Sequence, residues 1–571
     1  MEESQPHRRN RRYEDEDISP TRQLEIRGFY TYGLAAEVFA VCGVGSFLPV
    51  TLEQLARERG VLWGDKTTSC MDKAARNATT VAAHLMTRGT DDKNNQCIVT
   101  VFGSEITTSS FAMYTFSLAV FVQALTLISF SSVADYGNNR KKLLIGFGFT
   151  GAISSMLFLF IVPKVFLLGP LLTVIGVTCL GSSFVILNSF LPVLVANHPS
   201  IASSGSLSII GKADSPALAL STKISSKGVG IGYIAAGGVQ ILSIFLLFGL
   251  SKTNVSSTLP LRLVLLMVGV WWFVFTIPSG IWLRSRPGPP LPTRHASASR
   301  FRSAISYALF AWKSLFGTIK QALKLRQIVL FLIAWFLLSD AIATVSGTAI
   351  LFARTELHMG TVAVALLSIT ATSSGILGAF LWPVISKRNN LSAKQLIIAC
   401  IAFMEIIPLY GLLAFIPFVK NWGVGGLQKA WEVYPLAVIH GFVMGGLSSY
   451  CRALFGRLIP EGKEAAFYAL YAVTDKGSSA VGPAVVGMIV DRTGTIRGAF
   501  VFLAFLVLMP IPLIWYIDVE EGTEDGRRMA GFPRKDIEMR ETDEFGIDDD
   551  GSLLASDDEG EEGMRLMADH D

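Results

Sequence analysis

The sequence predicts an all-α polytopic membrane protein with about twelve transmembrane helices, arranged as two six-helix halves. Of its 571 residues, 51% are hydrophobic and only 16% are charged, whereas soluble domains carry about 25% charged residues. The apolar residues occur in blocks, many of them near the roughly 20 residues that a helix needs to cross a bilayer. A long polar interruption near the middle of the chain separates these blocks into two sets.

The first six-helix half is predicted to cover residues 28–283. Its first apolar block, 28–52, contains a single ionisable side chain, Glu37. A polar segment, 53–107, follows and is expected to form a long luminal loop. The remaining spans of this half are expected at 109–133, 143–162, 165–195, 229–250 and 260–283. Residues 1–27 are polar and have the composition of a disordered tail.

The second six-helix half is predicted to cover residues 328–518. A linker, 284–327, joins the two halves and is rich in basic residues and prolines. The spans of the second half are expected at 328–353, 362–385, 393–416, 433–456, 465–490 and 499–518. Residues 519–571 are acidic and poor in aromatic side chains, so they are expected to stay solvated and disordered.

The distribution of lysine and arginine predicts which loops face the cytosol, because cytoplasmic loops carry an excess of both. Basic residues concentrate in the N-terminal tail, in the central linker and in the short loop at 140–142. Two predicted spans separate the N-terminal tail from the loop at 140–142, and six separate it from the linker, so all three segments lie on the same side of the membrane. An even total number of spans places the C-terminus on that side as well. Both termini are therefore expected in the cytosol.

Luminal loops carry the candidate modification sites. Cys70 and Cys97 share the long polar loop, so an oxidising lumen allows a disulfide between them. Two such separated cysteines form no metal signature, and no metal site is expected. Asn77 begins an Asn-Ala-Thr glycosylation sequon, and Asn254 begins a second sequon in a shorter luminal loop.

The acidic C-terminal tail contains a candidate sorting signal. Asp549 precedes the pair Leu553 and Leu554, which fits an acidic dileucine of the kind that a sorting adaptor binds on the way to a vacuole or lysosome. Acidic tails produce such matches by chance, and that alternative stays open.

Two carboxylates are the leading candidates for a site inside the membrane. Glu37 and Asp340 lie in the first and seventh spans, which occupy equivalent positions in the two halves. An intramembrane carboxylate is costly unless it faces a wet cavity or a partner. Such a group can pair with a substrate ammonium or take up a proton. The alternative is a structural ion pair with a neighbouring base.

Three further polar side chains are secondary candidates. Arg452 has a planar guanidinium that suits a carboxylate, although an arginine near the end of a span can also extend to the membrane surface. His440, in the same span, is either a proton relay or a packed polar residue. Asn188 either binds substrate or caps and kinks the fourth span before Pro192.

Other function classes are disfavoured. Gly146, Gly148 and Gly151 match a dinucleotide fingerprint, but they lie inside a membrane span with no preceding strand, so close helix packing explains them better. The chain contains no Walker-type loop, which an ATP-driven pump would need. No cofactor, no enzyme activity and no nucleic-acid partner are expected.

The loop between the second and third spans resembles a loop of major facilitator transporters. Asp135, Gly137, Arg140 and Lys141 follow a thinned version of the pattern that latches the helices of one half in that superfamily, and residues 386–389 resemble its weaker copy after the eighth span. An ordinary basic turn is the alternative. The resemblance implies two halves that move about a central cavity, as major facilitator transporters do.

Three stretches resemble the autophagy-related vacuolar amino-acid effluxers of fungi. They are Arg27-Gly-Phe-Tyr30, Asn188-Ser-Phe-Leu-Pro192 and Ser226-Lys-Gly-Val-Gly-Ile-Gly-Tyr233. The resemblance implies a multi-pass protein of the vacuolar lipid bilayer that exports amino acids, leucine among them, to the cytosol after autophagic breakdown. A carrier for another solute, such as a sugar or peptide, and a non-transporting sensor or scaffold remain the alternatives.

Overall fold

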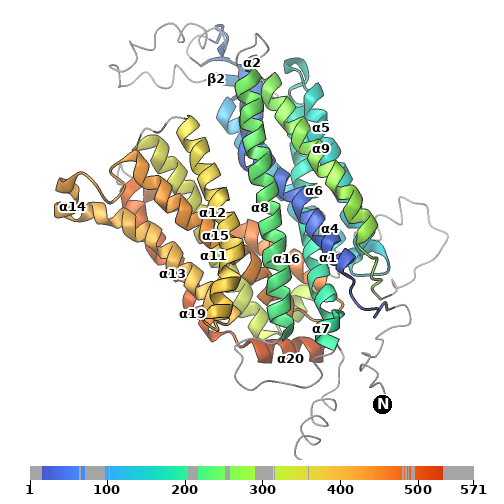
Figure 1. Cartoon of the computed structure of the whole chain (residues 1–571). Helices are drawn as coiled ribbons and strands as arrows, with labels where there is room; N and C mark the ends of the chain where they lie inside the picture. Colours follow the sequence, from blue (N-terminus) through green and yellow to red (C-terminus); the bar gives the residue numbers. More distant parts are fainter. Residues whose placement is uncertain are drawn as a thin grey trace, which may run out of the picture.

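The computed structural model is a helical bundle in which the first and second halves of the chain form two groups of long helices lying side by side (Figure 1). The structure describes residues 16–63, 66–70, 97–101, 103–202, 216–250, 258–289, 313, 316–357, 359, 361–478, 481–482, 485–486, 488–489 and 496–530. Within these ranges, nine helices are long and apolar enough to cross a membrane. The number twelve therefore stays a prediction.

The first half begins with one long rod, of which the central part is a π-helix. Residues Gln23–Arg59 form a continuous helical element of 37 residues, longer at both ends than the predicted 28–52. The π-helical segment follows directly after Glu37, and wide helical turns of this kind occur often at functional sites. The elements of this half are α1 (Gln23–Val38), η1 (Phe39–Phe47), α2 (Leu48–Arg59), α4 (Thr108–Ala134), α5 (Asn139–Leu157), α6 (Leu168–Ala196), α7 (Pro199–Ala202), α8 (Pro216–Leu250) and α9 (Leu259–Trp282), with short 3₁₀ turns η2 (Phe158–Phe160) and η3 (Pro163–Val165).

The second half repeats the pattern of long helices joined by short connections. Its helix boundaries lie within a few residues of the predicted spans, except that α16 is described only as far as Ser478. The elements are α11 (Arg326–Thr355), α12 (Thr361–Arg388), α13 (Ala393–Leu412), η4 (Leu413–Phe415), α14 (Pro417–Trp422), η5 (Ala430–Glu432), α15 (Val433–Leu458), α16 (Glu464–Ser478), η6 (Ile496–Gly498), α18 (Ala499–Leu508), α19 (Pro510–Tyr516) and α20 (Val519–Met529).

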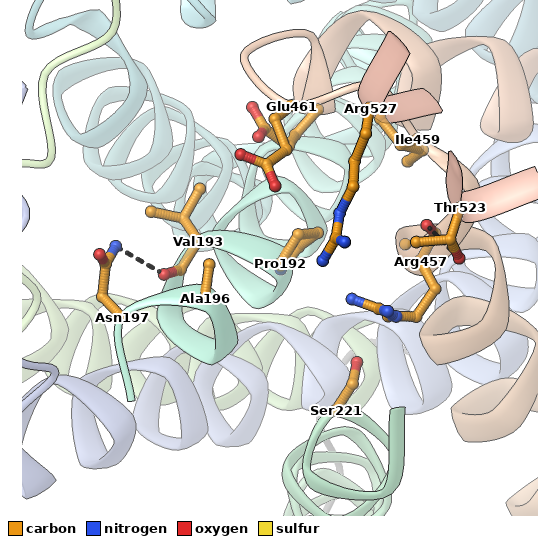
Figure 2. Close-up of a pocket in the computed structure, with 12 residues that line it drawn as sticks. Pro192, Val193, Ala196, Asn197, Ser221, Arg457, Ile459, Glu461, Thr523 and Arg527 are labelled. Atoms are coloured by element: carbon orange, nitrogen blue, oxygen red, sulfur yellow. Dashed lines mark hydrogen bonds between the residues drawn. The ribbon is translucent and has the colours of Figure 1, made fainter. Parts of the chain in front are cut away.

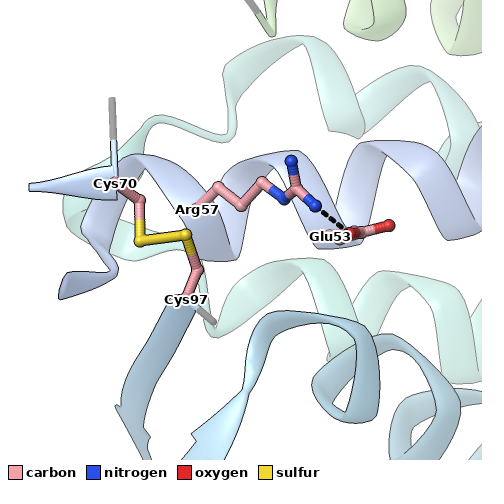
Figure 3. Close-up of a disulfide and its surroundings, with 4 residues drawn as sticks. All are labelled: Glu53, Arg57, Cys70 and Cys97. Atoms are coloured by element: carbon pink, nitrogen blue, oxygen red, sulfur yellow. Dashed lines mark hydrogen bonds and ion pairs between the residues drawn. A yellow bond between two sulfur atoms is a disulfide. The ribbon is translucent and has the colours of Figure 1, made fainter. Parts of the chain in front are cut away.

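A small sheet lies at one end of the bundle, which we call the disulfide end (Figure 1), and Figure 3 shows the disulfide bond there. Strands β1 (Val61–Leu62), β2 (Cys97–Val101) and β3 (Ser104–Thr107) pair antiparallel in the order β1-β2-β3. Cys70 and Cys97 are bonded to each other. The predicted long loop is therefore partly ordered, and it begins after Arg59 rather than at residue 53.

The prediction of a disordered tail over 1–27 is wrong for its last part. Arg286, just beyond α9, forms a buried ion pair with Glu25 of α1 at 2.9 Å. The same guanidinium donates to the carbonyl oxygens of Asp17 and Ser19. Composition did not reveal this clamp, because its two charged members lie 261 residues apart in sequence.

The predicted disordered tail 519–571 also begins too early. Residues Val519–Met529 form α20, which Asp518 caps by accepting hydrogen bonds from the backbone N–H groups of Glu520 and Glu521. A side chain at Gly522 would meet Leu458, so glycine lets α20 lie directly against the end of α15. This side of the molecule lies opposite the disulfide end in Figure 1. We call it the latch end, because Asp135 and Arg140 of the predicted latch loop lie there.

Small residues bring α1 and α8 into close contact, as expected for helices in lipid. A Cβ at Gly228 would lie 3.3 Å from Phe29, and one at Gly232 would lie 3.0 Å from the Cβ of Glu37. Lys227 sits over the ring of Tyr30 at 5.5 Å. Two of the stretches singled out in the sequence, 27–30 and 226–233, therefore pack against each other.

Replacing Arg286 by glutamine should destabilise the protein by about 3–5 kcal/mol, because Glu25 would be left buried without its partner. Thermal unfolding of the purified protein measures the loss. Arg284→Gln is the matched control: Arg284 is 3.7 Å from Glu25 and one-third exposed, so its loss should cost less than about 1 kcal/mol. Equal losses in the two variants would contradict the clamp.

Candidate functional site

A carboxylate and a guanidinium from different halves of the chain lie within electrostatic range of each other. Glu37 projects from α1 in the first half and Arg452 from α15 in the second, close enough for their charges to interact. Both side chains are half-buried. Among the described residues, the two groups form no direct ion pair with each other or with a third group. The interior of the bundle thus holds two opposite charges, one from each half, without a direct ion pair between them.

Tyr233 completes this central polar cluster, which we define as Glu37, Tyr233, Ser448 and Arg452. The Tyr233 hydroxyl interacts with Ser448 and lies within electrostatic range of both Glu37 and Arg452. Tyr233 belongs to α8, and its ring lies 3.0 Å from where a Cβ would stand on Gly375 of α12. Three helices from both halves thus contribute to the cluster.

Aromatic rings surround the Arg452 side of the cluster. Tyr468 and Tyr471 of α16 both interact electrostatically with Arg452, and the Tyr468 hydroxyl donates to the Arg452 carbonyl at 2.9 Å. Trp335 of α11 stacks on Tyr471 with ring centroids 4.5 Å apart. Arg452 is therefore held inside the bundle, and the alternative that it extends to the membrane surface does not describe this structure.

The structure does not bring Asp340 together with Glu37. Asp340 is only 3% exposed, and its carboxylate accepts a hydrogen bond at 2.9 Å from the backbone N–H of Gly482. This contact ties α11 to the segment that follows α16. The expectation that Asp340 and Glu37 form one paired site in a shared chamber is not supported by these contacts, which favour a structural role for Asp340.

The other two candidates lie elsewhere in the interior. His440 exchanges a hydrogen bond with Ser346 at 2.9 Å, linking α15 to α11. Asn188 is buried in α6, and its side-chain oxygen has no hydrogen-bond partner among the described residues. Pro192 stands one turn beyond Asn188, and the helix continues through it to Ala196.

A buried ionic cluster joins the two halves at the latch end. Arg140, at the start of α5, pairs with Asp135 at 2.9 Å and with Glu464 of α16 at 3.0 Å. Asp135 also accepts hydrogen bonds from the backbone N–H groups of Ala465 and Ala466, both at 2.9 Å. These amides belong to the first turn of α16, where the helix dipole favours a negative charge. We call Asp135, Arg140 and Glu464 the latch.

The electrostatics of Asp135 reflect this setting. Burial raises the pKa of Asp135 to about 6, while Arg140 and the two backbone amides act in the opposite direction. The carboxylate is thus largely ionised at neutral pH and loses charge on acidification. The latch should hold less firmly as the pH on its side falls towards 6.

The two remaining residues of the predicted latch pattern have different positions. Gly137 adopts a positive φ of 52°, and its N–H donates to Pro289 while its carbonyl accepts from Gly288. Glycine suits this turn because other residues rarely adopt that conformation. Lys141 is half-exposed and forms no ion pair with a described residue, so it does not belong to the latch.

Comparison with known proteins identifies the chain. The family model described as "Vacuole effluxer Atg22 like" matches residues 21–527. This chain belongs to that family. It is 60% identical over 598 aligned residues to Autophagy-related protein 22 of Botryotinia fuckeliana, covering 98% of both chains. It is also 59% identical to Autophagy-related protein 22-2 of Neosartorya fischeri, covering 92% of this chain and 93% of the relative.

Solved structures place the family's fold among the major facilitators. A proton:xylose symporter of the major facilitator superfamily matches 89% of this chain with a TM-score of 0.54 at 11% identity. A bacterial homologue of the iron transporter ferroportin in its outward-facing state matches 86% with a TM-score of 0.52 at 14% identity. The predicted fold class is confirmed, and the Atg22-like chain is a multi-pass membrane transporter rather than an enzyme.

Several predicted residues lie outside the part of the chain that the structure describes. They are Asn77, Asn254, Asp549, Leu553 and Leu554. Within the described part, no group of three or more histidine, cysteine, aspartate or glutamate side chains is arranged to hold a metal ion.

Sequence reasoning missed two important residues of this Atg22-like protein. Glu464 resembles an ordinary polar residue before the eleventh span, yet it is one of the three latch residues. Tyr233 lay within a quoted stretch but was not singled out. Glu464 follows Glu461 and Lys463 in a short loop, and nothing in such a loop indicates a partner 324 residues away.

The Arg140→Gln variant should open the latch end more readily than the wild-type protein. Two carboxylates would be left buried without their cation, which should destabilise the closed arrangement by about 3–5 kcal/mol. A cysteine placed at Val193, which lines the adjoining pocket, reports on the opening through its labelling rate with an impermeant maleimide. We expect the rate to rise at least several-fold. Lys142→Gln, which removes an exposed charge two residues away, is the control and should leave the rate unchanged; similar rates in both variants would contradict the latch.

Proposed function

We propose that this transporter exports neutral amino acids, leucine among them, from the vacuole to the cytosol after autophagic degradation. The observation that carries the proposal is that Glu37 and Arg452, from different halves, lie within electrostatic range of each other and form no direct ion pair within the described part of the chain. A free amino acid carries one ammonium and one carboxylate. The first matches the Glu37 carboxylate, and the second matches the fork of hydrogen-bond donors on Arg452.

The surroundings of the cluster suit a small zwitterion with an apolar side chain. Tyr233 and Ser448 offer hydroxyl groups, and the rings of Tyr471 and Trp335 offer apolar surface beside Arg452. Charged groups held in place by a rigid scaffold lose little freedom when the ligand binds. Recognition of the backbone groups, rather than of a particular side chain, would allow several neutral amino acids.

We place the latch end in the cytosol and the disulfide end in the vacuolar lumen. The basic loops favour this orientation, and a disulfide is stable in an oxidising compartment. The latch then closes the cytosolic side while the cluster faces the lumen. Substrate release requires the latch to part and the two halves to rock about the cluster.

Arg452→Gln should raise the apparent KM for leucine by about tenfold or more, because a charge-assisted hydrogen bond of about 1.5–3 kcal/mol would be lost. Uptake of labelled leucine into proteoliposomes measures the effect. Asp340→Asn is the matched control, since the Asp340 carboxylate accepts from the Gly482 amide rather than from a member of the cluster, and the KM of this variant should change little. An unchanged KM in Arg452→Gln would remove the cluster from substrate binding.

Proton coupling is the second part of the proposal and rests on Glu37. An imposed pH gradient should accelerate leucine transport by the wild-type protein, because a carboxylate in a poorly solvated site can bind and release a proton. Glu37→Gln cannot do so and should show no acceleration. Acceleration equal to that of the wild type would exclude Glu37 as the proton carrier.

The same assay separates the alternatives. Competition by an unlabelled sugar or dipeptide, and not by neutral amino acids, would indicate a different cargo. A scaffold that acts through its tail would lose its function when residues 531–571 are deleted. We expect this deletion, which leaves α20 intact, to preserve transport in purified vesicles.

A further inference from the structure

A pocket of about 70 Å³ lies between the two halves at the latch end, next to the latch (Figure 2). Its lining comes from α6 and α8 of the first half and from α15 and α20 of the second half. The volume admits several water molecules or one small polyatomic anion. No role proposed above uses this pocket.

Two arginines point into the pocket from neighbouring helices. Arg457, in the last turn of α15, and Arg527 of α20 direct their guanidinium groups towards each other in Figure 2. Neither forms an ion pair with a described residue, and the buried Nε of Arg457 lacks a hydrogen-bond partner. Two cations so close repel each other unless an anion lies between them.

Two carboxylates, Glu461 and Glu464, line the pocket together with the two arginines. Glu464 lines the pocket but is bound to Arg140 in the latch. Glu461 also lines it, and Glu461 and Arg527 both lie within electrostatic range of Arg457. Among the described residues that line the pocket, Glu461 is therefore the one carboxylate outside the latch, and it shares the pocket with two guanidinium groups.

The fold holds these arginines in place. Thr523 of α20 donates its hydroxyl to the Arg457 carbonyl at 3.3 Å, and Gln327 of α11 donates to Glu521 at 2.6 Å. Both contacts fix α20 beneath the second half, so that Arg527 projects over the pocket. On the opposite wall, Ser221 and Asn197 come from the first half.

We propose that this pocket binds a phosphate group, which Arg457 and Arg527 hold from the second half while it contacts the wall formed by the first half. Planar guanidinium groups bind phosphate oxygens in pairs, which makes arginine suited to this ligand. A phosphate seated there joins the two halves beside the latch. Its binding should favour the arrangement in which the latch end is closed. The phosphate is either free in solution or part of a phosphorylated lipid headgroup.

Thermal unfolding of the full-length protein in phosphatidylcholine nanodiscs tests the proposal. Inorganic phosphate should raise the Tm of the wild-type protein in a saturable manner, whereas chloride at equal ionic strength should not, because a ligand that binds the folded state stabilises it. In Arg527→Gln the apparent Kd for phosphate should rise at least about tenfold, as expected for losing one charge-assisted contact. Arg528→Gln is the matched control, since Arg528 is the next residue of α20 and pairs with Glu524 at the surface.

The source of the phosphate follows from a second arm with nanodiscs that contain a phosphatidylinositol phosphate. A higher Tm in these discs without free phosphate, lost in Arg527→Gln, assigns the site to the lipid headgroup. A response to inorganic phosphate alone assigns it to a soluble ligand. The absence of a saturable shift with either source overturns the proposal, as does a shift of equal size and affinity in Arg527→Gln and Arg528→Gln. Arg457→Gln provides a second variant, with the same expected loss.

Discussion

The structure depends on how buried charges are neutralised where the two halves meet. Arg140 forms ion pairs with two carboxylates, one from each half. One of them, Asp135, also accepts hydrogen bonds from two backbone N–H groups of α16. Taking such groups out of water is costly, and only a complete set of partners repays the cost. The latch is therefore intact only when the two halves are correctly placed, so it links the closure of one end to the position of every helix attached to it.

In the central cluster, unlike in the latch, the charged groups do not form a direct ion pair. Glu37 and Arg452 lie within electrostatic range of each other without forming a direct pair, whereas Glu25 and Arg286 form a buried ion pair. This contrast separates structural charges from those left available to a ligand. The same contrast distinguishes Arg457 and Arg527, whose guanidinium groups share one pocket at the latch end.

Much of the fold could be predicted from the sequence, because apolar blocks of sufficient length have few alternatives to membrane-spanning helices. The helix boundaries in α9, α12 and α15 lie within three residues of the prediction. Glu37 and Arg452 could also be singled out, since charges inside a span are rare. Composition failed at the termini, where residues 16–22 and α20 are ordered by contacts with distant segments rather than by their own hydrophobicity.

The sequence by itself determined the membrane class, the division into two halves, the family likeness and the short set of intramembrane charges. Only the tertiary structure decided which charges meet. It joined Arg140 to Glu464, set Glu37 opposite Arg452 rather than Asp340, and brought Arg527 to Arg457. The physical reason is that the hydrophobicity of a segment is a property of its own residues and can be calculated from the sequence. Ion pairing instead depends on distances of a few ångströms between side chains on helices that lie hundreds of residues apart in the chain.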